Sequence, residues 1–225
     1  MNKLKILGIA LISSVLMAVS SNAIEVRVGV SAGYAQLEAA GSETLKTTSV
    51  VTTHTEQANA MIPSVFAELA MDNGFGFGYD RISGSADLAG QAQKHTNVLM
   101  GIGNPDGDTG TQEAQATVDG VDTLYLIKTF QNGLLIKYGS SSADVITKET
   151  LATGAAYGNA SMDGTMMGLG FEHTNDSGVF LRTSVEHIDF DDIKLTATAD
   201  ADGLSNVIKA NVDVTLAKIS LGKKF

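Results

Sequence analysis

The sequence contains no cysteine and no tryptophan, and it has only 2 prolines against 24 glycines in 225 residues. The absence of cysteine excludes disulfides, thiolate metal sites, cysteine nucleophiles and a lipid-modified N-terminal cysteine. Charged residues are also few, at 18%, and they carry a formal net charge of −10. Because phosphate backbones are bound by clustered Lys and Arg, this acidic balance argues against nucleic acid as a partner.

Long apolar runs are scarce as well, since the one clear example covers residues 6–19. Lys3 and Lys5 precede this run, and small residues that include Ser21 and Ala23 follow it. A transmembrane helix needs about 20 apolar residues, so the run is too short for one. The pattern predicts a cleaved secretory signal peptide that ends at Ala23.

Cleavage there leaves a single predicted domain, residues 24–225, with a net charge of −12 because two lysines leave with the signal. An exported chain of this length without cysteine suggests a bacterial envelope, where folding does not depend on disulfides.

The predicted domain alternates apolar and polar residues with period two, which is typical of β-strands with two unlike faces. In the first segment, Ile24, Val26, Val28 and Val30 share one face, whereas Glu25 and Arg27 share the other. Eight such segments occur, at residues 24–34, 64–71, 75–80, 122–129, 134–139, 165–172, 179–186 and 216–225.

The connections between these segments are alternately short and long. Short polar turns are expected at 72–74, 131–133 and 173–178, and the first two contain Asn-Gly, which adopts positive φ at little cost. Long loops are expected at 37–60, 83–116, 141–160 and 191–206. The Thr-rich stretch 44–55 offers an extra hairpin as an alternative.

The polar faces decide between a soluble barrel and a membrane barrel. They carry equal numbers of acids and bases although the chain is strongly acidic, and this balance suits ion pairs inside a narrow lumen. The predicted barrel-interior charges are Glu25, Arg27, Glu68, Asp80, Asp122, Lys128, Lys137, Glu172, Arg182, Glu186, Lys218 and Lys224. Aromatic residues expected near strand ends or on the outer face are Tyr34, Phe75, Tyr79, Tyr125, Phe130, Tyr138 and Phe225. The sequence therefore predicts an all-β, eight-stranded antiparallel up-and-down transmembrane barrel with short periplasmic turns and long extracellular loops.

These features together resemble the small OmpA/OmpX-like outer-membrane β-barrel proteins. The resemblance implies a location in the outer membrane and a C-terminal strand that the barrel-assembly machinery recognises. The residues that match this signal are Ala217, Ile219, Leu221 and Phe225. Lys223 departs from the pattern, in which an apolar or aromatic residue is usual.

Catalytic and metal-binding patterns are weak. No G-x-S-x-G motif is present, and His187, which lies among several acids near the end of a strand, is interpreted as a rim residue. The stretches 104–108 and 200–203 resemble calcium loops but lack the glutamate at the twelfth position, so polar turns are the favoured interpretation and weak divalent binding stays open. We expect no catalytic site, no cofactor and no dedicated metal site.

An eight-stranded barrel is just wide enough for side chains to fill its interior. The leading hypothesis is therefore a structural or surface-interaction protein, a monomer that contacts outer-membrane lipid and lipopolysaccharide. A narrow passive pore for ions or small solutes is the alternative, and a lipid A-modifying enzyme is a third hypothesis.

Overall fold

The computed structural model describes residues 24–44, 49, 51–87, 93–95, 112–150, 156–198 and 206–225. Within them no helix is long and apolar enough to cross a membrane. The predicted signal peptide, residues 1–23, lies outside the described residues. The strands are β1 (Ile24–Thr44), β2 (Val51–Met71), β3 (Phe75–Asp87), β4 (Gln93–His95), β5 (Gln112–Thr129), β6 (Leu134–Thr150), β7 (Ala160–Thr174), β8 (Val179–Phe190), β9 (Ile193–Thr196) and β10 (Val207–Lys224).

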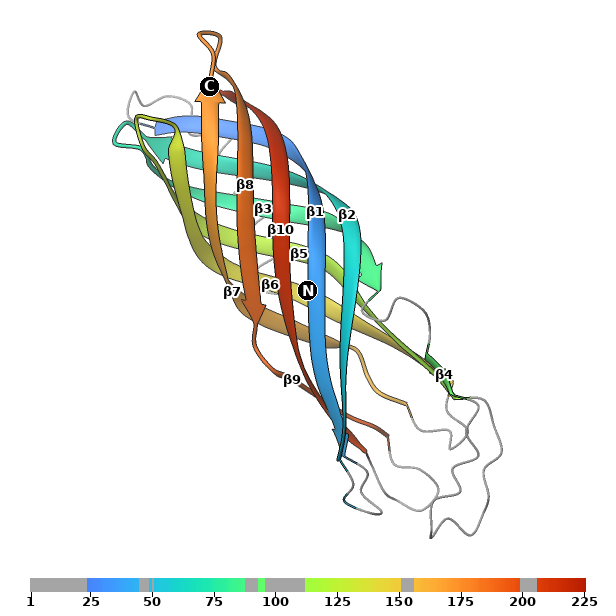
Figure 1. Cartoon of the computed structure of the whole chain (residues 1–225). Helices are drawn as coiled ribbons and strands as arrows, with labels where there is room; N and C mark the ends of the chain where they lie inside the picture. Colours follow the sequence, from blue (N-terminus) through green and yellow to red (C-terminus); the bar gives the residue numbers. More distant parts are fainter. Residues whose placement is uncertain are drawn as a thin grey trace, which may run out of the picture.

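Eight of these strands form a closed antiparallel barrel, which confirms the predicted fold class (Figure 1). The ring runs β1-β2-β3-β5-β6-β7-β8-β10, and β10 closes it by pairing with β1. The short strands β4 and β9 lie outside the ring and pair with β5 and β10. Closure leaves no strand edge exposed along the ring, which is what a sheet needs in order to cross a lipid bilayer.

The register sets the tilt of the strands. A row of paired residues that starts at Ala67 on β2 passes through Tyr79, continues around the barrel and returns to β2 at Gln57, ten residues away. Such a stagger requires strands tilted by about 40°, so each residue gains about 2.5 Å of height. The row itself climbs about 3 Å at each step from one strand to the next.

The three short connections use the same device. In each, an Asn side-chain oxygen accepts a backbone N–H: Asn73 from Phe75, Asn132 from Leu134, and Asn175 from Val179. A glycine with positive φ follows each time, at Gly74, Gly133 and Gly178. Glycine adopts this backbone conformation without strain, so the turns at Gly74 and Gly133 confirm the prediction from Asn-Gly.

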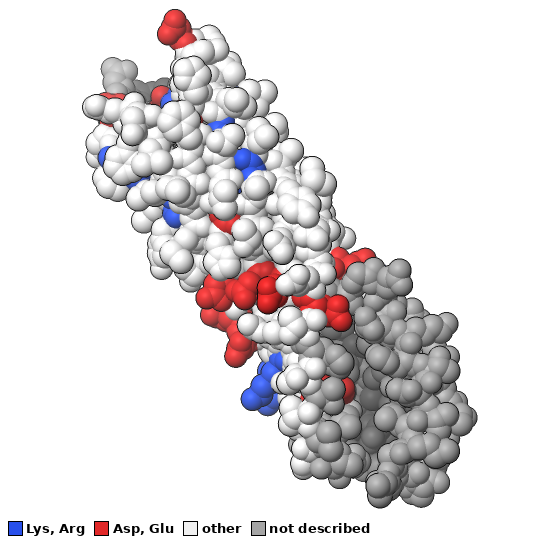
Figure 2. Space-filling model, viewed as in Figure 1, with Lys and Arg blue, Asp and Glu red and all other residues white. Residues whose placement is uncertain are grey.

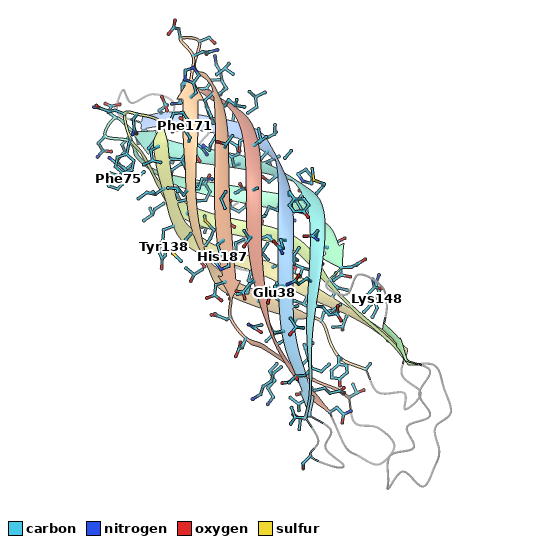
Figure 3. All side chains as sticks on the ribbon, in the orientation of Figure 1. Glu38, Phe75, Tyr138, Lys148, Phe171 and His187 are labelled. Atoms are coloured by element: carbon cyan, nitrogen blue, oxygen red, sulfur yellow. The ribbon has the colours of Figure 1, made fainter. Side chains whose placement is uncertain are left out.

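In the half of the barrel near these turns, apolar side chains point outward. Val30, Tyr138, Leu169 and Ile219 are each about half exposed or more. The labelled Phe75, Tyr138 and Phe171 project away from the barrel in Figure 3. Arg27, Lys137, Arg182 and Lys218 point inward and are buried. This arrangement, apolar outside and polar inside, is that of a membrane-spanning barrel.

The strands are longer than the sequence predicted, and much of the expected loop sequence is strand. β1 continues to Thr44 and β2 starts at Val51, so residues 51–55 of the Thr-rich stretch belong to β2 and not to an additional hairpin. Likewise β5 starts at Gln112 and β6 ends at Thr150. The four loop connections therefore extend from a barrel that is longer than the membrane requires.

This upper half reverses the polarity of its faces. Its inner face is apolar and includes Leu37, Val118, Val145, Met162 and Val212, all buried. Its outer face becomes acidic. We call Glu38, Asp144, Asp163, Asp189 and Asp213 the acidic girdle. They lie on β1, β6, β7, β8 and β10, and Asp213 is in register with both Glu38 and Asp189. Figure 2 shows a belt of acidic residues that borders a mostly uncharged wall.

The acidic girdle lies where the membrane should end. The row of paired residues that passes through Tyr79 on β3 reaches Asp189 four strands further on. Phe75 lies four residues below Tyr79 on β3, at the turn end. The strand geometry places Asp189 about 23 Å above Phe75. This height matches the apolar band of about 25 Å in outer-membrane barrels. The strands above the girdle therefore project beyond the bilayer.

Candidate functional site

The centre of the lower lumen is the guanidinium of Arg182 on β8. Its Nη1 and Nη2 donate to the two carboxylate oxygens of Glu68 at 2.7 and 2.8 Å, and Nη2 also donates to Glu172 at 2.7 Å. The rings of Phe66 and Phe180 lie 5.2 and 5.1 Å from the guanidinium carbon. One buried cation thus joins β8 to its neighbour β7 and, across the lumen, to β2, whose Glu68 is 114 residues away in the sequence.

A second ion-pair layer lies above the first. Lys137 donates to Glu186 at 2.8 Å, and Lys218 contacts Asp80 at 2.5 Å and Glu186 at 3.4 Å. Tyr125 connects the two layers, because its hydroxyl donates to Glu68 at 2.7 Å while Lys137 lies 4.7 Å from its ring centre. Opposite charges therefore meet at hydrogen-bonding distance across the barrel, and this geometry neutralises buried charges in pairs.

The remaining interior charges lie at the turn end. Arg27 contacts Glu25 at 2.5 Å and Glu172 at 3.5 Å, and Lys224 contacts Glu172 at 3.0 Å. A cavity of about 510 Å³ opens beside them and is lined by Glu25 and Arg27, by residues 71–74 and by residues 128–131. The structure thus brings together ten of the predicted interior charges, Glu25, Arg27, Glu68, Asp80, Lys137, Glu172, Arg182, Glu186, Lys218 and Lys224.

The prediction of an interior position is wrong for Asp122 and Lys128 on β5. Tyr125 points into the lumen, so by alternation Asp122 and Lys128 lie on the outer face with Leu126. Lys128 lies at the turn end, where its ammonium donates to the carbonyl of Asn73 at 2.5 Å and sits 4.2 Å from the ring centre of Phe75. The expected outward position of Tyr125 is wrong for the same reason.

The sequence did not predict aromatic rings inside the lumen. Phe66, Tyr125 and Phe180 each lie over a glycine of a neighbouring strand, namely Gly29, Gly78 and Gly222. A Cβ at any of these glycines would come within 2.4 Å of the ring. The glycines of the polar face therefore make room for aromatic rings. The sequence carries a sign of this arrangement, because strands with aromatic residues lie beside Gly-rich strands.

Above the ion pairs, an apolar layer fills the lumen. Every strand of the ring contributes an inward-facing apolar side chain to this layer, and most of these are buried. The contributors are Leu37, Ile62, Ile82, Val118, Val145, Met162, Ile188 and Val214. Along the lumen, a layer of paired charges is therefore followed by a layer without charge.

The histidines do not assemble a catalytic or metal site in the part of the chain that the structure describes. His187 lies on the outer face, where its Nδ1 is 3.1 Å from Thr215 Oγ1 (Figure 3). His173 lies on β7 and not in a turn. Among the described side chains no group of three His, Asp or Glu could hold a metal ion. The calcium-like stretches 104–108 and 200–203 lie outside the described residues.

A closed eight-stranded barrel with an apolar outer wall and a charged lumen defines the chain as a bacterial outer-membrane β-barrel protein. The structure of OprG from Pseudomonas aeruginosa shares this fold, with a TM-score of 0.61 at 14% identity over 90% of this chain and 96% of that one. Ail of Yersinia pestis is less similar, with a TM-score of 0.41 at 10% identity over 88% of this chain and 98% of that one. The outer-membrane protease OmpT from Escherichia coli has a TM-score of 0.47 at 8% identity over 89% of this chain and 97% of that one. No family model and no curated protein matches the sequence. The likeness confirms the fold predicted from the resemblance to small OmpA/OmpX-like barrels.

Proposed function

We propose that the protein is a closed, non-enzymatic membrane anchor that presents its loops at the cell surface. The observation that carries this proposal is the filled lumen. Arg182, Glu68, Lys137 and Glu186 are each at most 6% exposed and are bonded to one another or to other lumen residues. Water and ions crossing the barrel would have to separate these pairs.

The apolar layer supports the same proposal. Val145, Met162 and Ile188 are at most 2% exposed, so little room for water is left beside them. A hydrophobic constriction blocks ions because they cannot keep their hydration shell inside it. The lumen therefore has two barriers in series, one charged and one apolar.

A narrow passive pore is the second candidate. It is favoured by the cavity of about 510 Å³ at the turn end, which is lined by Glu25 and Arg27. Conductance across a planar bilayer separates the two candidates. A closed anchor gives no discrete currents from the refolded chain 24–225, whereas salt-dependent single-channel steps would contradict our proposal.

We further propose that residues 1–23 are removed on export and that the C-terminal strand is read during assembly. Ile219, Leu221 and Phe225 point outward and are 61%, 56% and 64% exposed. Lys223, which departs from the pattern, donates to the backbone carbonyl of Ser177 in the neighbouring turn. Its ammonium therefore lies at the edge of the membrane, where a lysine is tolerated.

A further inference from the structure

The lipid-facing wall carries an ion pair below the acidic girdle. Arg81 on β3 donates from Nη1 to both carboxylate oxygens of Asp122 on β5, at 2.8 and 2.9 Å. The hydroxyl of Tyr79 donates to the same carboxylate. Ionisable residues on the lipid face cost free energy, so an ion pair in this position calls for a functional explanation.

The guanidinium of Arg81 reaches the level of the lipid headgroups. The strand geometry places the Arg81 backbone about 8 Å below Asp189 of the acidic girdle. The side chain covers that distance, because a Cβ placed on Gly120 would lie 3.7 Å from Arg81 Nη2. Gly120 comes two residues above Asp122 on β5, at about the height of the girdle.

Two β-bulges lie beside this ion pair, one on each strand. The β3–β5 register shifts between Ile82 and Ser85, where Gly84 has φ 119°. The β5–β6 register shifts between Asp119 and Val121, where Gly120 has φ 59°. Bulges increase the local twist and re-aim side chains, and they are frequent beside functional sites.

The chemistry of the pair fits an oxyanion. Both hydrogen bonds from Arg81 to Asp122 come from Nη1, and within the described residues the guanidinium edge formed by Nε and Nη2 has room for another acceptor, because the Arg81 side chain is 40% exposed. That planar edge matches two oxygens of a phosphate. On the β6, β7, β8, β10 and β1 side, the acidic girdle repels phosphates, so the β3–β5 seam is the favourable place for one.

We infer that Arg81, held in position by Asp122 and Tyr79, binds a phosphate of an outer-leaflet lipopolysaccharide molecule. The inference rests on the proposed function only for the orientation of the barrel. It adds a specific lipid site on the β3–β5 seam to a wall that offers mostly apolar contacts.

Native mass spectrometry of the refolded chain 24–225 tests this inference, with diphosphorylated lipid A as the probe. We expect Arg81→Gln to lower the affinity for lipid A about tenfold, because one charge-assisted bidentate contact is lost. Arg81→Lys keeps the charge but loses the planar pair of guanidinium donors, so its affinity for lipid A should fall between those of the unmodified chain and Arg81→Gln. Lys128→Gln is the matched control, since it removes an outward-facing cation at the opposite end and should stay within about twofold of the unmodified chain. Heat-modifiable gel migration verifies that each variant folds.

Four results would overturn the inference. The first is that Arg81→Gln binds as well as the unmodified chain, and the second is that Lys128→Gln loses as much affinity as Arg81→Gln. The third is that the unmodified chain is a dimer that Arg81→Gln separates, which would assign the site to a second copy of the chain. Lipid A without phosphates should bind the unmodified chain no better than Arg81→Gln binds intact lipid A, and tighter binding would also contradict the inference. A conducting barrel would refute the closed-anchor proposal and would leave this result unaffected.

Discussion

Replacing Arg182 with methionine removes the cation that joins Glu68 to Glu172. The side chain is 1% exposed, and it donates four hydrogen bonds to these two carboxylates. In Arg182→Met, Glu172 keeps Lys224 at 3.0 Å, whereas among the described residues Glu68 keeps one hydrogen bond, from the hydroxyl of Tyr125. Removing one partner of a buried ion pair typically costs about 3–5 kcal/mol, so we expect a loss of this size in the free energy of unfolding.

The measurement is equilibrium unfolding by urea in lipid vesicles, followed by far-ultraviolet circular dichroism because the chain has no tryptophan. The double variant Glu68→Gln/Arg182→Met should recover part of the loss, since it no longer buries an uncompensated carboxylate. Lys128→Met, at the exposed turn end, is the control and should change stability by about 0.5 kcal/mol or less. A loss below about 1 kcal/mol for Arg182→Met, with strictly additive effects in the double variant, would refute the buried network.

Three further changes test other parts of the structure by the same unfolding measurement. Tyr125→Phe removes the hydroxyl that donates to Glu68, and we expect a loss of about 1–2 kcal/mol; an unchanged midpoint would show that this hydrogen bond contributes nothing. Gly139→Ala places a Cβ 2.2 Å from the carbonyl oxygen of Leu124, so it should cost about 1–3 kcal/mol, whereas Gly158→Ala meets no atom within 4 Å and should be nearly neutral; equal effects would contradict the packing described. Ile188→Asn buries an unpaired amide in the apolar layer and should cost about 3 kcal/mol, while His187→Asn on the outer face should cost far less; the reverse order would show that the faces of β8 are exchanged.

The lower half of the barrel could be predicted because on most strands its two faces differ in polarity. On β8, Leu181 and Val185 face lipid while Arg182 and Glu186 face the lumen, so one residue of slip would bury the wrong set. β5 is the exception. Leu124 and Leu126 alternate with Tyr125 and Ile127, both faces are apolar, and the polar residues Asp122 and Lys128 then misdirect the assignment.

The upper half could not be predicted from the same rule because its polarity is reversed. On β10, Asp213 faces outward while Val212 and Val214 face inward, as in a water-soluble barrel. If apolar residues are assumed to face lipid, the upper part of each strand does not fit the expected alternation and is assigned to a loop. The ten-residue stagger also could not be foreseen, since it depends on how all eight strands pair around the ring. That stagger is what brings the guanidinium of Arg81, whose backbone lies about 8 Å below Asp189, close to the level of the acidic girdle.

The most direct test of a closed lumen is the access of a water-soluble thiol reagent to its interior. The natural chain has no cysteine, so a single cysteine can be introduced without a competing thiol. Ser141 is 0% exposed, and its hydroxyl lies 2.8 Å from that of Thr123 inside the barrel. Asn211→Cys, on the exposed outer face of β10, provides the accessible control. We predict that a charged methanethiosulfonate modifies Asn211→Cys at once but reaches Ser141→Cys only after unfolding, and rapid modification of Ser141→Cys in the folded barrel would contradict the closed lumen.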